Sequence, residues 1–337
     1  MKLRSPYPWY GGKRRVADIV WRALGDPPNY VEPFFGSGAV LLGRSQAGKI
    51  ETINDLDCNV ANFWRAIQAA PDEVASWCDW PVNEADLHAR HAWLVEQLGT
   101  LRTRCAEDPD FYDVKIAGWW VWGLSTWIGS GWCAGPLHRK IPSIGHGSKG
   151  IHSLTLPSGK TPRLQRDGGV HTSRLPSLGN AKGIHGLSKP PCAKWFADLA
   201  ARLRRVRVAC GDWKRIVTPA VMGFGSGVGG MKPCAVFLDP PYSHEKRDKD
   251  LYAVESGTVA AEVAQWARDN GDNPELRIVL CGLDGEHEMP GTWTRHEWRS
   301  KGYGSQKKDS TREVLWFSPH CQAAQLQGSL FGEVANG

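Results

Sequence analysis

The residues best suited to chemistry stand together at Asp239-Pro240-Pro241-Tyr242, directly after the all-apolar segment 235–238. An apolar run of this length is typical of a strand in a buried parallel sheet, and ligands gather at the carboxyl ends of such strands. Two consecutive prolines lack N–H donors and fix φ, so the turn is rigid and its carbonyls stay free to accept hydrogen bonds. The motif therefore offers a carboxylate, a carbonyl and an aromatic ring in one fixed arrangement.

This arrangement suits transfer of a methyl group to the exocyclic amine of a nucleobase. Asp239 and the Pro240 carbonyl would accept the two N–H hydrogens and direct the nitrogen lone pair out of the base plane, toward a methyl donor. Tyr242 would stack on the ring, and a base in a duplex would first have to leave its stack. Catalysis would rest on positioning and charge placement, with no metal ion. Taken alone, the motif is equally compatible with an ordinary β-turn.

A candidate donor site, Glu32-Pro33-Phe34-Phe35-Gly36-Ser37-Gly38, lies between a strand expected at 30–31 and a helix expected at 39–44. Glycines let a backbone approach a ligand closely. The turn suits the methionine part of S-adenosylmethionine, whose sulfonium charge Glu32 would favour. No G-K-[ST] follows the glycines, which argues against a phosphate-binding loop. A plain glycine turn is the alternative for this motif alone.

Two further motifs complete the candidate cofactor site. Asp55 follows a strand expected at 50–53 and would accept the ribose hydroxyls, as acidic residues do in dinucleotide folds. Trp9-Tyr10-Gly11-Gly12-Lys13 precedes a helix expected at 14–24, and its ring, flexible turn and lysine would close over the cofactor.

The elements that must position these motifs alternate between strand and helix, which predicts an α/β protein with a doubly wound sheet. The alternation breaks after residue 70 and resumes near residue 195, so one long insertion interrupts the sheet. We expect four parts: the first half of a catalytic domain at 1–70, a target-recognition insertion at 71–194, the second half at 195–321 and a tail at 322–337. The other elements expected are helices at 60–69, 195–205 and 259–269, and strands at 206–210, 277–281 and 313–317.

Positive charge is concentrated in the insertion. Segment 135–194 holds ten Lys or Arg and one acid, Asp167, so it carries +9 while the rest of the chain carries −3 of the net +6. Such a local excess suits a polyanion, and these side chains would neutralise DNA phosphates. A solvated loop is compatible with the same composition. The candidate DNA-binding residues are Arg139, Lys140, Lys149, Lys160, Arg163, Arg166, Arg174 and Lys182.

Cysteine usage and the N-terminus indicate the compartment. The nine cysteines include no C-x-x-C pair, which argues against a disulfide framework or a zinc site and fits a reducing cytosol. The first ten residues lack the layout of a signal peptide, and no apolar run approaches the roughly 18 residues of a membrane span. We therefore expect a cytoplasmic protein that acts on DNA. The five tryptophans of 119–132 are expected in the core rather than stacked on bases.

The tail contains Gln327-Gly328-Ser329-Leu330-Phe331. A glutamine followed by a leucine–phenylalanine pair resembles the short peptides that dock into the bacterial sliding clamp. Gln327 would then bond at the rim of a pocket that Leu330 and Phe331 fill. The alternative is that the apolar pair packs on the protein's own surface.

Taken together, the motifs resemble those of the Dam-like (D12 class) adenine-N6 DNA methyltransferases in type, order and spacing. The matching stretches are 8–13, 31–40, Asn54-Asp55 and Asp239-Pro240-Pro241-Tyr242. The resemblance implies a class I S-adenosylmethionine-dependent methyltransferase sheet with a helical and loop target-recognition insertion, and a double-stranded DNA substrate. It carries over cofactor contacts at Trp9, Lys13, Glu32, Phe34, Gly36, Gly38 and Asp55, and catalytic contacts at Asp239, Pro240 and Tyr242. Their neighbours Tyr10, Gly11, Phe35, Ser37 and Pro241, and Asp239 on the cofactor side, complete the candidate set.

The middle of the chain departs from the family pattern. Residues 125–131 read Ser-Thr-Trp-Ile-Gly-Ser-Gly where family members show an Arg-Tyr-Asn-like stretch, so recognition of GATC does not follow. Three alternatives stay open: an N4-cytosine enzyme, for which serine at position 239 would be more usual, a structured-RNA methyltransferase, and a catalytically silent DNA-binding module. Intact Asp239 and Tyr242 favour an enzyme.

Overall fold

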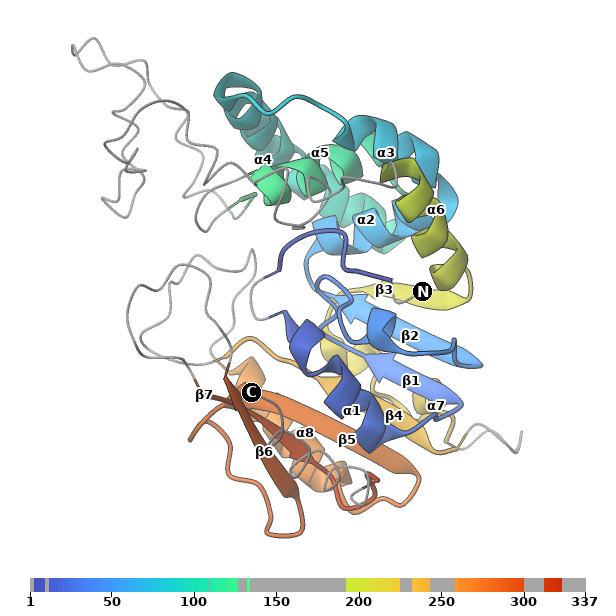
Figure 1. Ribbon diagram of the computed structural model, residues 1–337, viewed down its shortest axis with the longest axis vertical. Coiled ribbons are helices and arrows are strands. Elements are labelled where there is room, and N and C mark those ends of the chain that lie inside the picture. Colours follow the sequence, from blue (N-terminus) through green and yellow to red (C-terminus); the bar gives the residue numbers. More distant parts are fainter. Residues whose placement is uncertain are drawn as a thin grey trace, which may run out of the picture.

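The computed structural model describes residues 3–9, 12–108, 110–126, 132–133, 192–224, 232–242, 258–299 and 312–322. Within them, one seven-stranded sheet has the order β3-β2-β1-β4-β5-β7-β6 (Figure 1). The strands β3, β2, β1, β4 and β5 are parallel neighbours, and β7 is antiparallel to β5 and β6. The predicted doubly wound α/β sheet is confirmed. The strands are β1 Asn29–Glu32, β2 Ile50–Asp55, β3 Val206–Cys210, β4 Cys234–Leu238, β5 Leu276–Leu283, β6 Thr294–Arg299 and β7 Arg312–Phe317.

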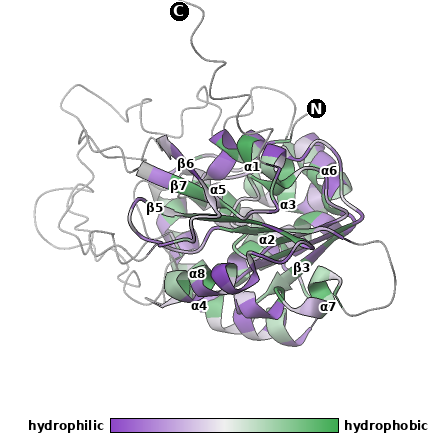
Figure 2. Ribbon diagram, turned by 90° about the horizontal axis from the view of Figure 1, so that it is seen from below, coloured by the Kyte–Doolittle hydropathy of each residue, from purple (hydrophilic) through white to green (hydrophobic). Residues whose placement is uncertain are grey.

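Helices cover both faces of this sheet (Figure 2). One face packs on α1, α2 and α6, and the other on α7 and α8. None of the described helices combines the length and the apolar character that crossing a bilayer requires. The helices and 3₁₀ turns are η1 Lys13–Arg15, α1 Ala17–Leu24, η2 Leu41–Gly43, α2 Cys58–Ala69, α3 Pro71–Cys78, α4 Glu84–Glu107, α5 Val114–Thr126, α6 Cys192–Leu203, η6 Trp213–Arg215, α7 Pro219–Met222 and α8 Val259–Asn270.

Strand β4 shows why the catalytic candidate lies at the middle of the sheet. Successive side chains of a strand point to opposite faces. Ala235 and Phe237 pack in the cluster under α1, α2 and α6, whereas Val236 and Leu238 pack in the cluster under α7 and α8. Every residue of β4 is buried, as a strand covered on both faces requires. Asp239 therefore follows the carboxyl end of a central strand that is packed on both faces.

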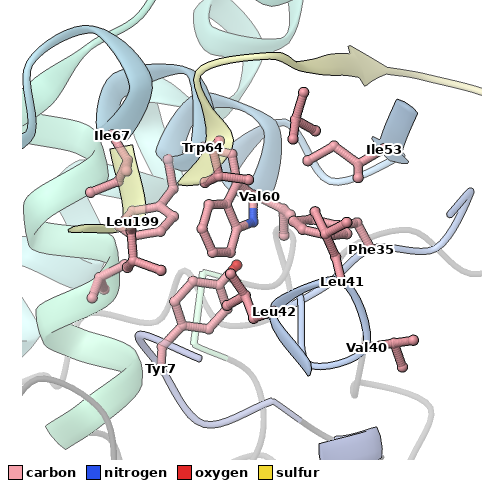
Figure 3. Packing of buried hydrophobic residues seen from close by; sticks show 14 of the residues in the cluster. Tyr7, Phe35, Val40, Leu41, Leu42, Ile53, Val60, Trp64, Ile67 and Leu199 are labelled. Carbon is pink, nitrogen blue, oxygen red and sulfur yellow. The ribbon is translucent and has the colours of Figure 1, made fainter. Parts of the chain in front are cut away.

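Helices α3, α4 and α5 gather with α2 and α6 at one end of the molecule (Figure 1). Their core is aromatic. Trp64 of α2 lies among Tyr7, Phe35 and Leu199 (Figure 3), and Trp120, Trp122 and Trp132 are buried. The core role expected for the tryptophan cluster is confirmed for these three residues, while Trp127 lies outside the described part of the chain.

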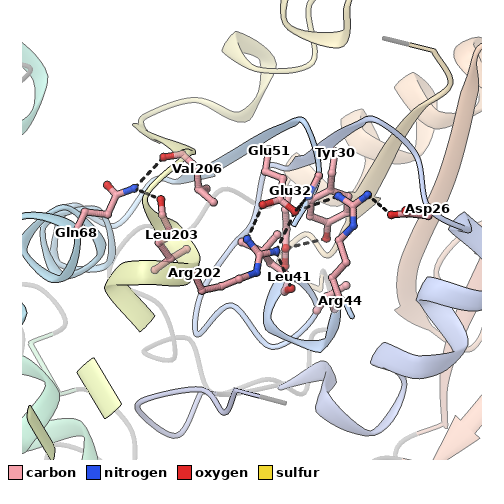
Figure 4. Close-up of polar contacts among 12 residues, drawn as sticks. Asp26, Tyr30, Glu32, Leu41, Arg44, Glu51, Gln68, Arg202, Leu203 and Val206 are labelled. Atoms are coloured by element: carbon pink, nitrogen blue, oxygen red, sulfur yellow. Dashed lines mark hydrogen bonds and ion pairs between the residues drawn. The ribbon is translucent and has the colours of Figure 1, made fainter. Parts of the chain in front are cut away.

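A charged cluster links the first and second halves of the predicted catalytic domain. The Glu51 carboxylate of β2 accepts hydrogen bonds from Arg44 Nη1 at 3.0 Å and from Arg202 Nη1 of α6 at 2.6 Å (Figure 4). Arg202 Nη2 donates to the other oxygen at 2.9 Å, and the Gly48 N–H adds a bond of 3.0 Å. Glu51 and Arg44 are buried. Helix α6 is therefore tied to β2 and to the turn before it by paired charges.

Three local expectations need correction. Segment 39–44 is no α-helix but a single 3₁₀ turn at Leu41–Gly43, because the chain is extended again at Arg44, whose guanidinium is held by Glu51. A helix directly after residue 70 was not among the elements expected: Pro71 opens α3 at the first helical position, where its missing N–H costs nothing. Strand β6 was not expected, since its sequence Thr-Arg-His-Glu-Trp-Arg is mostly polar, as an edge strand tolerates.

Candidate active site

Three predicted motifs meet at one edge of the sheet. β1 lies between β2 and β4 and is parallel to both, so Glu32, Asp55 and Leu238 end neighbouring strands at the same edge. The strand order reverses between β1 and β4, and ligands of open α/β sheets bind at such switch points. The glycine turn that follows β1 therefore lies between the motif that follows β4 and the acid that ends β2.

Lys13 joins the first motif of the chain to Asp239. Its Nζ lies 2.9 Å from Asp239 Oδ1 and 5.2 Å from the centroid of the Tyr242 ring. The Tyr242 hydroxyl donates to the same Asp239 oxygen at 3.4 Å. Sequence reasoning assigned Lys13 to the cofactor, and that role stays a prediction; the described contact is with the carboxylate expected to hold the target amine.

Glu313 of β7 is a site residue that sequence reasoning missed. Its Oε2 lies 3.4 Å from Lys13 Nζ and 3.2 Å from the Tyr242 hydroxyl, whose single proton is shared between Glu313 and Asp239. The Lys13 and Glu313 side chains are 4% and 6% exposed, so the pair is buried. The sequence held one signal for it, since Glu313 is a charged residue that directly precedes the apolar run 314–317. Unpaired buried charges are costly, so such a residue calls for a partner.

Burial and charge set the protonation of this group. Burial raises the pKa of Asp239, against the opposing effect of Lys13. Burial also raises the pKa of Tyr242 well above its usual range, so its hydroxyl stays a donor. Burial alone would lower the pKa of Lys13, but Asp239, Tyr242, Cys281 and Glu313 together hold it well above the usual value. The site thus holds a permanent ammonium between two carboxylates.

The turn after β1 requires glycine at Gly36. Its φ is +48°, and an added Cβ would lie 2.4 Å from Nε1 of Trp9. Its carbonyl accepts hydrogen bonds from the Tyr7 hydroxyl at 2.8 Å and from Trp64 Nε1 at 3.1 Å, and its N–H donates to Asp55 Oδ2 at 2.9 Å. These contacts fix the path of the turn and bring it directly against Asp55.

Asp55 is held by the backbone on both oxygens. Oδ2 accepts from Gly36, and Oδ1 accepts from the Asp57 N–H at 2.9 Å. Burial, followed by the charge of Asp57, raises the pKa of Asp55 to about 7. The next residue, Leu56, is 48% exposed and offers an apolar surface beside the carboxylate.

The remaining candidates of the glycine turn differ in accessibility. Glu32 is buried and accepts a 2.8 Å hydrogen bond from the Tyr30 hydroxyl, and burial raises its pKa well above the usual range. Phe35 packs on Trp64 with ring centroids 5.2 Å apart, in the core, and Ser37 is also buried. Phe34 is partly buried. Gly36 and Gly38 are buried as well, so Phe34 is the one candidate of this turn that the structure leaves partly exposed.

Other candidates lie outside the described residues: Tyr10 and Gly11 of the first motif, all eight basic residues assigned to DNA, and Gln327, Leu330 and Phe331 of the tail. Their roles, and the domain boundaries, stay predictions.

Comparison with known proteins agrees with the geometry. Residues 9–89 match the family of D12 class N6 adenine-specific DNA methyltransferases. A DNA N-6-adenine-methyltransferase of Escherichia phage P1 is 30% identical over 96 residues, which cover 27% of this chain and 12% of the phage protein. The resemblance is thereby confirmed over the motifs within residues 9–89, whereas Asp239-Pro240-Pro241-Tyr242 lies outside the matched residues. Residues 9–89 are thus similar in sequence to the D12 class N6 adenine-specific DNA methyltransferase family, and they contribute to a seven-stranded, mostly parallel sheet of the class I methyltransferase type.

Proposed function

We propose that this protein transfers a methyl group from S-adenosylmethionine to N6 of adenine in double-stranded DNA. The observation that carries the proposal is the position of Asp239-Pro240-Pro241-Tyr242 at the switch point of the sheet, next to the glycine turn of a D12 class segment. The Asp239 carboxylate is bonded to Lys13 and Tyr242, so its orientation is preset before any substrate arrives.

The chain's own residues would act on an extruded adenine in a fixed order. Tyr242 would hold the base by stacking, and Asp239 and the Pro240 carbonyl would accept its two amine hydrogens. The nitrogen lone pair would then point out of the base plane. S-adenosylmethionine, when bound, supplies an electrophilic methyl group. After transfer the alkylated nitrogen is a strong acid, and Asp239 would take the proton that it releases.

The residues around the glycine turn fit such a cofactor. Gly36 and Gly38 have positive φ values, and at both an added Cβ would collide with a ring of the protein itself, so this path of the turn beside Asp55 requires glycine. Asp55 would accept the ribose hydroxyls of the cofactor, and Leu56 would contact the cofactor's adenine ring. Trp9 would cover the glycine turn. Glu32 would help a sulfonium charge only in its ionised form, which its burial disfavours.

We expect affinity for S-adenosylmethionine to rise with pH through about 7. The raised pKa of Asp55 means that the empty protein holds a proton there below this value, and a protonated carboxyl accepts poorly from ribose hydroxyls. Calorimetric titration from about pH 6 to about pH 8 should show the dissociation constant falling as pH rises. Asp55→Asn should weaken binding about tenfold and flatten the dependence.

The matched control for this titration is Asp284→Asn, which changes an exposed aspartate paired with Arg295 on the neighbouring part of the sheet. It should reproduce the wild-type curve. A wild-type affinity that is constant across the range would contradict the assignment of Asp55 to the ribose.

Transfer of radiolabel from S-adenosylmethionine tests the proposed substrate class. Equal amounts of unmethylated duplex DNA, single-stranded DNA and structured RNA are offered to the full chain. Label should enter the duplex DNA. Label entering only RNA would support the RNA methyltransferase alternative, and DNA binding without label entering any substrate would support the silent module.

The partners beyond the site also belong to this proposal. The basic residues of 135–194 would bind DNA phosphates, and base extrusion would follow. A bacterial or phage setting fits the phage P1 relative. Docking of 327–331 on a sliding clamp rests on the tail sequence alone.

A further inference from the structure

The described site holds one more buried carboxylate than methyl transfer requires. We propose that Glu313 is a positioning residue: it takes over the Lys13 ammonium and holds the Tyr242 hydroxyl when Asp239 engages the amine of the target base. The inference rests on the proposed function and adds to it a residue from a different part of the chain.

Glu313 reaches the site from the antiparallel end of the sheet. It stands opposite Leu283 of β5 and Trp298 of β6 in the strand register. The four residues that follow it in β7 are buried and apolar. A carboxylate in such surroundings is unfavourable unless it is paired, and its described partners are Lys13 and Tyr242. The buried Glu313 carboxylate therefore depends on Lys13 and Tyr242 for its stabilisation.

The distances show what Glu313 would be needed for. Lys13 Nζ lies 2.9 Å from Asp239 Oδ1, and the Tyr242 hydroxyl lies 3.4 Å from the same oxygen. An amine that enters to use this oxygen must displace or share these donors. Glu313 Oε2 is already 3.4 Å from Lys13 Nζ and 3.2 Å from the hydroxyl. Both donors can thus keep a buried acceptor while Asp239 turns to the base.

The same geometry couples Glu313 to the pH dependence of the reaction. The negative charge of Glu313 contributes to raising the pKa of Asp239, after burial and against Lys13. Removing that charge should lower the pKa of Asp239, so the acidic limb of the rate profile should move to lower pH. The other ionisable groups facing this site are Lys13 of η1, Glu32 of β1, Cys281 of β5 and Tyr242.

The test compares the full-length wild type with Glu313→Gln, which keeps the shape and removes the charge. We expect kcat to fall about tenfold, because charge-assisted hydrogen bonds are lost, while the affinity for S-adenosylmethionine stays at the wild-type value. The acidic limb should shift to lower pH. The matched control is Glu297→Gln, an exposed glutamate of β6 that pairs with Arg295, and it should behave as wild type.

Tyr242→Phe provides a second variant that removes only the hydroxyl held by Glu313. It should lower kcat about threefold, and the double variant should lose less than the product of the two single effects, as coupled residues do. A wild-type kcat in both single variants would overturn the inference. So would a loss of kcat in Glu313→Gln with an unmoved acidic limb and a matching loss of cofactor affinity. A wild type that transfers no methyl group would instead refute the proposed function, and the inference with it.

Discussion

Replacing Asp239 with asparagine is expected to reduce methyl transfer about a thousandfold, the scale seen when a preorganised charge-stabilising group is removed. The variant keeps the shape of the turn but turns an acceptor into a mixed donor and acceptor. Its Oδ1 would accept an amine hydrogen only as a neutral group, and it could not take the proton released after transfer. Lys13 would keep Glu313 as a partner at 3.4 Å, so the fold should persist. Single-turnover kinetics with labelled cofactor measures the effect.

The same preparation should bind S-adenosylmethionine nearly as tightly as the wild type, because Asp55 and the Gly36 turn are unchanged. Asp284→Asn serves as the matched control, since Asp284 directly follows β5, the strand beside β4, and is exposed. An Asp239→Asn enzyme with more than about a tenth of wild-type activity would contradict the role of this carboxylate.

Replacing Glu51 with glutamine is expected to lower the free energy of unfolding by about 3 kcal/mol. Glu51 is the acceptor on which Arg44 and Arg202 converge, at distances of 2.6–3.0 Å. Without the negative charge of Glu51, the buried Arg44 guanidinium would lose its buried counter-charge. The amide N–H₂ of the new glutamine would also face a guanidinium. Urea unfolding followed by tryptophan fluorescence measures the loss.

The matched control for stability is Glu275→Gln, which breaks an exposed pair with Lys232. Exposed pairs contribute about 0.5 kcal/mol, so this variant should unfold close to the wild type. Equal midpoints for Glu51→Gln and the control would show that the cluster does not tie α6 to β2.

Elements whose conformation depends on neighbouring residues in the chain were predicted well from the sequence. Residues 235–238 are apolar because both faces of β4 are covered, and the rigid Asp239-Pro240-Pro241-Tyr242 turn follows from its prolines. The glycines at 36 and 38 predicted a tight turn after the first strand, and the structure gives a further reason for glycine there, because a side chain at Gly36 would collide with Trp9; the ligand role of the turn stays a prediction. Local propensity was less reliable at 39–44, where the ion pair of Arg44 with Glu51 accompanies a return to extended chain.

Ion pairs between residues far apart in the sequence could not be predicted from local patterns. Lys13 and Glu313 are 300 residues apart in sequence, and only the register of β7 beside β5 brings the glutamate to the site. Arg202 finds Glu51 because α6 packs on the sheet next to α2. Strand β6 pairs with β7 on one side alone, so its side chains carry no apolar pattern from which a strand could be predicted.

The most direct test of the account is the identity of the methylated nucleoside. Unmethylated duplex DNA is incubated with the protein and with S-adenosylmethionine that carries a deuterated methyl group, then digested and analysed by mass spectrometry. The account predicts deuterated N6-methyldeoxyadenosine, absent when Asp239→Asn replaces the wild type. Deuterated N4-methyldeoxycytidine, or no labelled nucleoside at all, would contradict it.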